Sequence, residues 1–404
     1  MGLAVIHRYD VRRSMPVSNT KKILAAAFIA GFFSIVNLTG CNEGQKSPGA
    51  ATTGTKTIPQ TKRDTRTAAN FQTFVTYRYT DKVTAMEAFR LLVPKGWGAQ
   101  GQITWSENPA LPAQACFRFS NPNGAGELNL FPTQAYFWTN NRLFLSTNPP
   151  GSLRFGTRVM SPIDLHTAFA KVIIPQVRSG VSGIRVIKEN EVPELANIAR
   201  GKPVQGVRSY ASGGKMRIDY QETGRLMEEE LYAVVSQFVT DLPGYFINYW
   251  YIDHVFSFKA EKNGLDPLAK VFQTMVYSMK VNPRWFAKVA NVREMMAQNA
   301  IRGIKAIGRI GDMVARAGSE MRESQMRDWE QRQRANDRVI QNFTDNIRGV
   351  ERFNDPHSGK EVELPSGYGR AFANNLGEYI VTDSPSYNPS IGSNLHWEEM
   401  RPAK

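Results

Sequence analysis

The chain has 404 residues, of which 42% are apolar and 11% aromatic, and this composition is sufficient for one or two packed domains. Its formal net charge of +14 points to anionic partners, although solubility alone is an equally good explanation. The two cysteines are Cys41 and Cys116, and modification of either leaves no internal disulfide. The composition therefore argues against a disordered chain and excludes a disulfide-stabilised scaffold.

The stretch from Lys21 to Cys41 has the pattern of an export signal. Two lysines precede fourteen uncharged residues, Ile23 to Val36, and the run closes on Leu38-Thr39-Gly40-Cys41. The apolar part is too short to span a bilayer comfortably, so the pattern predicts a cleaved signal. The closing tetrad resembles the lipobox of bacterial lipoproteins, which implies cleavage before Cys41 and a diacylglycerol on its sulfur. An ordinary secretory signal with a cysteine nearby is the alternative.

The residues around this signal refine the prediction. Fourteen residues precede Met15, an unusually long lead, so we expect translation to start at Met15. Loss of residues 1–40 removes five basic residues and one acidic residue, which leaves a mature charge of about +10. In an exported protein this charge favours anionic lipid headgroups, wall polymers or an acidic partner over nucleic acid. If the organism has two membranes, Asn42 after the lipidated cysteine implies the outer membrane, facing the periplasm or the cell surface.

Residues 42–70 are rich in Gly, Thr, Pro and Lys and are predicted to be a disordered tether, because they cannot bury enough apolar surface to fold. Strand-like alternation begins at Phe71, and short aromatic runs bounded by turn residues predict an antiparallel sheet. Cys116 lies in one such run and is expected to be a small core residue rather than a nucleophile. The predicted strands are 71–79, 89–93, 102–105, 115–119, 127–131 and 135–138.

The next region mixes helices and strands. A helix is predicted from Pro162 to Ile174, with Ser161 as its cap and Pro175 as its stop. An amphipathic helix from Asp266 to Met279 closes the region. Between them a second set of strands is expected at 183–188, 205–210, 213–221, 229–238 and 245–259.

Two runs resemble the PsbP-like family of exported α/β/α domains: Phe89 to Trp97, which ends in Pro-Lys-Gly-Trp, and Ser278 to Trp285. The resemblance covers Phe71 to about Asn282. It implies an α+β fold built as an antiparallel-sheet α/β/α sandwich, and a role as a scaffold or assembly factor without a conserved catalytic set. The Pro/Gly-rich residues 121–156 depart from the family pattern.

Residues 287–347 lack proline and carry apolar residues at steps of three and four, which predicts a long helical segment. Glycines interrupt the apolar stripe, so the sequence fits either one long helix or two helices joined near Gly318. The interleaved charges of this segment favour a solvated face over a nucleic-acid patch.

From Val350 onward the pattern predicts a small β-meander that docks on the helical segment or on the first domain. The predicted organisation is a signal at 1–40, the lipidated cysteine and tether at 41–70, an α+β domain at 71–282, a helical segment at 283–348 and a small β-rich C-terminal unit at 349–404.

Motifs for catalysis are scarce. The histidines after Cys41 have no metal-binding spacing, and the chain has no P-loop, nucleophile elbow or dinucleotide fingerprint, so no metal and no cofactor is predicted. His254, beside Asp253 in a strand-like run, is expected to be buried and hydrogen-bonded. Turn capping explains Asp355 and His357 as well as an active site does. The residues that could converge as an active site are His357, His396, Asp355, Glu378 and Asp383.

The aromatic run from Tyr245 to Tyr251 fits the core of a central strand, and its alternate rings become an interface if their side of the sheet is uncovered. The candidate partner-binding residues are Tyr249, Trp250, Tyr251, Ile304, Ile307 and Trp329.

Three functions stay open at this stage. The favoured one is a lipid-anchored cell-envelope protein that acts as a non-catalytic binding, scaffold or assembly module, held at the membrane through Cys41 and bound to an envelope protein. The second is an envelope hydrolase or wall-polymer enzyme that uses the C-terminal carboxylates. The third is a binder of anionic glycan or lipid headgroups.

Overall fold

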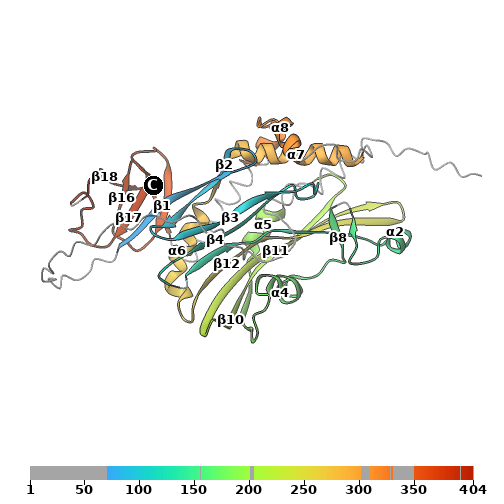
Figure 1. Ribbon diagram of the computed structural model, residues 1–404, viewed down its shortest axis with the longest axis horizontal. Helices are drawn as coiled ribbons and strands as arrows, with labels where there is room; N and C mark the ends of the chain where they lie inside the picture. Colours follow the sequence, from blue (N-terminus) through green and yellow to red (C-terminus); the bar gives the residue numbers. More distant parts are fainter. Residues whose placement is uncertain are drawn as a thin grey trace, which may run out of the picture.

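The computed structural model describes residues 71–124, 126–154, 156–200, 204–301, 310–327, 329–330, 350–391 and 393–403. The predicted signal, Cys41 and the tether lie outside the described residues. The described chain is mixed α+β with more strand than helix, and its antiparallel sheets are curled (Figure 1). In this part of the chain no helix combines the length and the apolar character that crossing a membrane requires.

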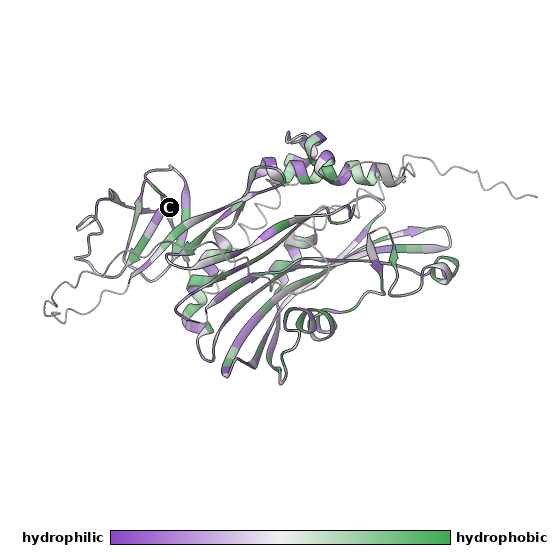
Figure 2. Cartoon of the chain, viewed as in Figure 1, coloured by the Kyte–Doolittle hydropathy of each residue, from purple (hydrophilic) through white to green (hydrophobic). Residues whose placement is uncertain are grey.

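The largest sheet has ten strands and is dominated by three long neighbours, β10, β11 and β12. Apolar and polar residues alternate along these strands (Figure 2), so each side of the sheet can bury a different set of side chains. In hydrogen-bonded order the sheet contains β3 (Gly98–Trp105), β4 (Ala113–Ser120), β5 (Glu127–Leu130), β12 (Tyr245–Glu261), β11 (Arg225–Leu242), β10 (Arg208–Glu222) and β9 (Arg185–Glu191), with β6 (Gln134–Thr139), β8 (Thr157–Val159) and β7 (Leu153–Arg154) attached beside β12.

Four strands of the first predicted set, those at 102–105, 115–119, 127–131 and 135–138, share this sheet with the second set, whereas the strands predicted at 71–79 and 89–93 belong to another sheet. Strand β12 connects the two groups of strands, because it pairs with β11 on one side and with β5 and β6 on the other. The strands predicted at 205–210 and 213–221 merge into the single strand β10.

The prediction that the C-terminal unit docks on the first domain is confirmed, and the contact is made by strands of one shared sheet. Strand β17 pairs with β1, with Phe71 opposite Thr382, and both ends of the described chain therefore share one six-stranded sheet. This sheet runs β13 (Lys280–Val281), β2 (Met86–Pro94), β1 (Phe71–Asp81), β17 (Glu378–Thr382), β16 (Arg370–Asn374) and β18 (Trp397–Glu399), and a three-stranded sheet adds β15 (Glu361–Pro365), β14 (Val350–Asn354) and β19 (Arg401–Pro402).

Helices α6 (Leu265–Tyr277) and α7 (Pro283–Ile301) contribute to the largest hydrophobic core. The prediction of an amphipathic helix near Asp266 to Met279 is confirmed, and its apolar side buries Phe272 and Met275. The described part of the predicted apolar stripe, including Val292 and Val314, is also covered within this core.

The described residues after 287 do not form one continuous long helix. Lys288 of α7 donates to the carbonyl of Val314 in α8 (Ile310–Arg316) at 3.0 Å, although 26 residues separate them. A straight helix would place them about 39 Å apart at about 1.5 Å per residue, so the chain folds back between the two helices.

The helix predicted over Pro162 to Ile174 is confirmed as a helical run that begins three residues later and ends at Val177. Its parts are α3 (Leu165–Ala168), the π-helical turn η1 (Phe169–Ile173) and α4 (Ile174–Val177), which follow one another without a break. The cap is Asp164, which accepts the Thr167 amide at 2.7 Å, rather than Ser161. Pro175 was predicted to end the helix but lies inside α4, because the wider turn of η1 changes the hydrogen-bond register before the proline. The sequence also gave no sign of the helices α2 (Arg142–Thr147) and α5 (Pro193–Arg200).

A buried carboxylate connects three distant elements. Asp81, at the end of β1, accepts the indole N–H of Trp105 and that of Trp285, each at 2.9 Å. These residues belong to β1, β3 and α7, so one side chain fixes how both large sheets meet the helical segment.

Candidate functional site

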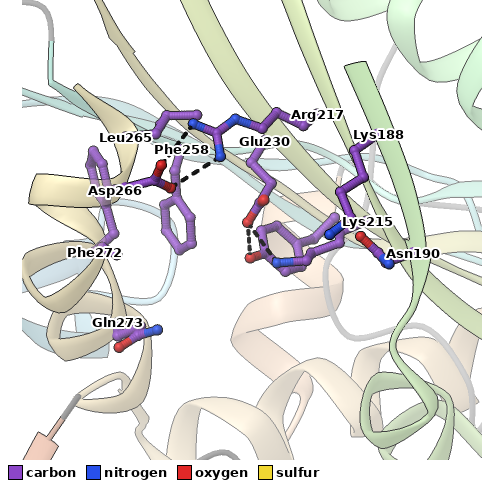
Figure 3. A pocket seen from close by; sticks show the side chains of 12 residues that line it. Lys188, Asn190, Lys215, Arg217, Glu230, Phe258, Leu265, Asp266, Phe272 and Gln273 are labelled. Carbon is purple, nitrogen blue, oxygen red and sulfur yellow. Dashed lines mark hydrogen bonds and ion pairs between the residues drawn. The ribbon is translucent and has the colours of Figure 1, made fainter. Parts of the chain in front are cut away.

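A pocket of about 250 Å³ lies between α6 and four strands of the large sheet (Figure 3). We call it the α6 pocket. Strands β9, β10, β11 and β12 supply one wall and α6 supplies the other. Its lining is Lys188, Asn190, Lys215, Arg217, Glu230, Tyr232, Phe258, Leu265, Asp266, Ala269, Phe272 and Gln273.

The alternation of side chains along the strands and the helical spacing along α6 explain why these residues converge. Lys215 and Arg217 alternate on β10 with Met216 and Ile218, which are fully buried in the core on the other side of the sheet. The register places Lys188 opposite Arg217 and Asn190 opposite Lys215, so the polar side chains of neighbouring strands gather on one side. The lining residues of α6 recur at helical spacing and face them.

The charges of the pocket are largely matched. Lys215 lies 3.1 Å from Glu230, and Arg217 contacts Asp266 at 3.0 Å and Glu228, beside the pocket, at 2.8 Å. Burial disfavours charge on Arg217, but its hydrogen bonds to the two carboxylates raise its pKa above the ordinary value. Lys188 is exposed at the rim and has no ion-pair partner within the described part of the chain.

Aromatic rings form the inner surface. Tyr232 and Phe258 belong to β11 and β12, and Phe258 stacks on Phe272 of α6 with ring centroids 4.7 Å apart. The Lys215 ammonium lies 5.6 Å from the centre of the Tyr232 ring. Burial, and then the neighbouring Glu230, which accepts a hydrogen bond from the phenol, raise the pKa of Tyr232 well above its ordinary value, so the phenol stays neutral.

The pocket combines paired charges with an apolar floor. The twelve described lining residues include no histidine, cysteine, serine or threonine, and the carboxylate of Glu230 is held by Lys215 and Tyr232. Matched ion pairs around an apolar floor offer many hydrogen-bonding groups with little net charge. The volume lies just below the range of about 300–1,000 Å³ that is usual for ligand pockets, so it suits a small ligand.

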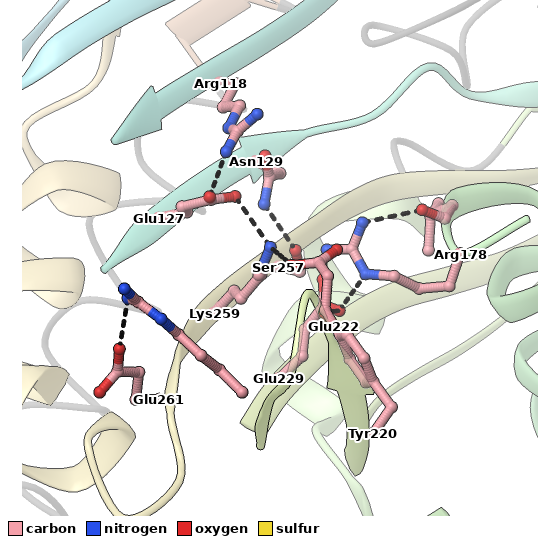
Figure 4. A network of polar contacts seen from close by, with 12 residues as sticks. Arg118, Glu127, Asn129, Arg178, Tyr220, Glu222, Glu229, Ser257, Lys259 and Glu261 are labelled. Carbon is pink, nitrogen blue, oxygen red and sulfur yellow. Dashed lines mark hydrogen bonds and ion pairs between the residues drawn. The ribbon is translucent and has the colours of Figure 1, made fainter. Parts of the chain in front are cut away.

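A second set of charges lies across the sheet from the pocket (Figure 4). Arg178 binds the fully buried Glu229 through two contacts, Nε to Oε2 at 2.6 Å and Nη2 to Oε1 at 2.5 Å, and Tyr220 donates to the same carboxylate at 3.0 Å. Lys259 reaches Glu222 at 2.5 Å and Glu127 at 3.6 Å. These groups are mutually paired, which identifies a structural network rather than a second binding site.

The structure describes four of the predicted partner-binding residues, and none of these four has an exposed side chain. Trp250 and Tyr251 are fully buried, so the prediction that this aromatic run forms the core of a central strand is confirmed for both, and a partner cannot reach them in the folded chain. Tyr249 is partly buried against Phe137. Trp329 is helical and partly buried, and Ile304 and Ile307 lie outside the described residues.

Two single-residue predictions have mixed outcomes. His254 does form the expected hydrogen bond, from Nδ1 to the buried Asp253 at 2.6 Å, but its side chain is partly exposed where the pairing of β11 and β12 shifts register. Cys116 was expected in the core and is partly exposed, because it alternates with the buried Phe117 on β4.

The C-terminal polar residues serve turns and strand contacts. Asp355 accepts the backbone amide of His357 at 2.9 Å and the Tyr379 hydroxyl at 2.8 Å, which confirms turn capping at this position. Glu378 pairs with Lys95, the residue directly after β2, at 3.2 Å. The predicted pair His357 and His396 does come together, with ring centroids 6.4 Å apart, but both rings face Glu398, at 4.0 and 3.3 Å, which was not in the predicted set. Among the described residues no three side chains of His, Cys, Asp or Glu gather in a way that could hold a metal ion.

Comparison with known proteins gives no family for the chain, since no family model and no curated protein matches it. The residues of the α6 pocket could therefore be predicted only from the pattern of the sequence itself. The sequence did carry a signal for them, because charged residues at 215, 217 and 219 share one side of a predicted strand. The helix that closes the pocket is far from them in sequence, and no local pattern pairs the two.

Proposed function

We propose that the chain is a lipid-anchored protein of the bacterial cell envelope that acts as a non-catalytic binding module and takes a saccharide unit of the envelope in the α6 pocket. The anchor is the lipid on Cys41, and the mature protein faces the periplasm or the cell surface. The basic start, the uncharged run and the lipobox-like tetrad support this part of the proposal.

The observation that carries the binding proposal is the chemistry of the α6 pocket. Sugars present many hydroxyl groups and little charge, and they are bound by groups that both donate and accept hydrogen bonds beside an apolar surface. The paired Lys215 and Glu230 and the amides of Asn190 and Gln273 provide such groups over the aromatic floor. Lys188 adds one cation at the rim for an anionic substituent, which makes an acidic sugar of the envelope the best match.

The PsbP-like resemblance stays part of the proposal and supports a scaffold or assembly role over catalysis. Its two motif runs are neighbours in space, since β13 pairs with β2 through Lys280 opposite Arg90 and Val281 opposite Phe89. An α/β/α sandwich of that family is the finer fold that we propose for residues 71–282. An envelope protein would then be the second partner of the anchored module.

Calorimetric titration of the purified full chain tests the binding proposal. The probes are the disaccharide of N-acetylglucosamine and N-acetylmuramic acid, which carries a carboxylate, and the neutral disaccharide of N-acetylglucosamine. Ala269→Phe fills the pocket and should abolish binding of both, whereas Ala315→Phe on the exposed side of α8 is the matched control. Lys188→Gln should weaken the acidic disaccharide by about two- to fivefold and leave the neutral one unchanged. Absence of binding at millimolar disaccharide, or equal binding by Ala269→Phe and the parent chain, would contradict the proposal.

A further inference from the structure

The described residues from 140 to 158, which connect β6 to β8 and include the start of β8, form an arm at the opposite end of the molecule from the C-terminal strands (Figure 1). Asn141 caps α2 by accepting the Phe144 amide at 3.0 Å, and the Phe144 ring packs on Phe137 with centroids 5.1 Å apart. The arm is also tied to the end of β12, where the Phe246 amide donates to Asn140 at 2.8 Å. These contacts hold its base, yet no residue of α2 is buried.

The arm exposes apolar side chains that the fold does not use. Leu143 is 79% exposed and Leu153 is 70% exposed, and both lie on this short stretch. Burial of a leucine side chain lowers the free energy, so the two exposed leucines give the arm apolar surface that a partner surface can cover.

The charge of the arm identifies the kind of surface that covers it. Arg142, Arg154 and Arg158 are all exposed, and the sequence from residue 140 to residue 163 contains no acidic residue. A group of arginines interleaved with exposed leucines complements an anionic bilayer, because the guanidinium groups meet lipid phosphates while the leucines enter the headgroup boundary.

We propose that this arm docks the folded part of the protein onto an anionic lipid bilayer. The inference goes beyond the proposed function, because it neither requires the lipid on Cys41 nor involves the α6 pocket. Docking through the arm fixes which end of the large sheet meets the membrane and leaves the C-terminal strands at the far end, away from it (Figure 1).

A fluorophore placed on the arm tests the proposal locally. In the full chain with Cys41→Ser and Cys116→Ser, an environment-sensitive dye is attached at Leu153→Cys, and in a matched control at Ile391→Cys, which is 79% exposed on the C-terminal unit. Vesicles of phosphatidylglycerol and phosphatidylcholine should shift the emission of the arm dye to shorter wavelength and increase it severalfold, with little change at the control position. Arg142→Gln should weaken vesicle binding, read from the arm dye, by about fivefold, and Arg158→Gln by a similar factor.

Attachment of the chain through its N-terminal residues would affect the emission of both dyes. The difference between the two dye positions therefore reports the arm alone. No change at the arm in anionic vesicles, or an equal change at position 391, would overturn the proposal. An equal response to pure phosphatidylcholine would overturn the role of charge. A shift that grows with protein concentration without vesicles would identify a second copy of the chain as the occupant and would also overturn it.

Discussion

The buried ion pair between Arg178 and Glu229 gives the sharpest stability prediction. Glu229 is fully buried and the Arg178 side chain is 12% exposed. Arg178→Met keeps the aliphatic stem but leaves the Glu229 carboxylate with the Tyr220 hydroxyl as its remaining partner in the described contacts. Removing one partner of a buried pair costs about 3–5 kcal/mol, because the remaining charge is uncompensated.

Urea unfolding at pH 7 measures this cost, and the chain offers a matched control. The pair between Arg225 and Glu261 has side chains that are 65% and 53% exposed, so Arg225→Met should cost less than about 1 kcal/mol. Arg178→Met combined with Glu229→Met should recover part of the lost stability, because the unpaired charge is then gone. Equal costs for Arg178→Met and Arg225→Met would refute the argument that burial decides the energy of these pairs.

Three further predictions concern single positions. Asp81→Ala leaves two indole N–H groups without their acceptor and should lower the free energy of unfolding by about 2–4 kcal/mol in urea titrations. Hydrogen bonding to Arg185 lowers the pKa of Asp219, so this carboxylate stabilises the fold above about pH 4 and the stabilisation is lost as pH falls through the folded-state pKa. Asp219→Asn should therefore lower the urea midpoint at pH 7, and the gap to the parent chain should close in acid. Gly213→Ala would place a Cβ 2.7 Å from a backbone nitrogen of α5 and should lower the melting temperature, whereas Gly369→Ala meets no atom within 4 Å and should not.

Local patterns predicted the elements whose burial follows from their own sequence. The alternation in the long strands and the helical spacing around Phe272 each indicate an element with one apolar side, and the structure buries those sides. The turn at Asp355 was likewise predictable, because an aspartate before Pro-His-Ser satisfies nearby backbone amides.

Long-range pairing was beyond such patterns. Nothing near Phe71 indicates that it pairs with Thr382, and nothing near Lys288 indicates that it contacts Val314. The same limit explains the site, since Lys215 and Asp266 acquire a shared role only when α6 packs on the sheet. The position of Pro175 inside α4, rather than at the end of a helix, was not predictable because the π-helical turn before it has no clear signature in the sequence.

The intact mass of the mature protein, purified from membranes of cells that express the full chain, tests the central claim of an anchored module most directly. We predict a chain that begins at Cys41 and carries a diacylglycerol on its sulfur, and a Cys41→Ser variant that is released from the membrane fraction. A mature chain that begins at another residue, or that begins at an unmodified Cys41, would contradict the account.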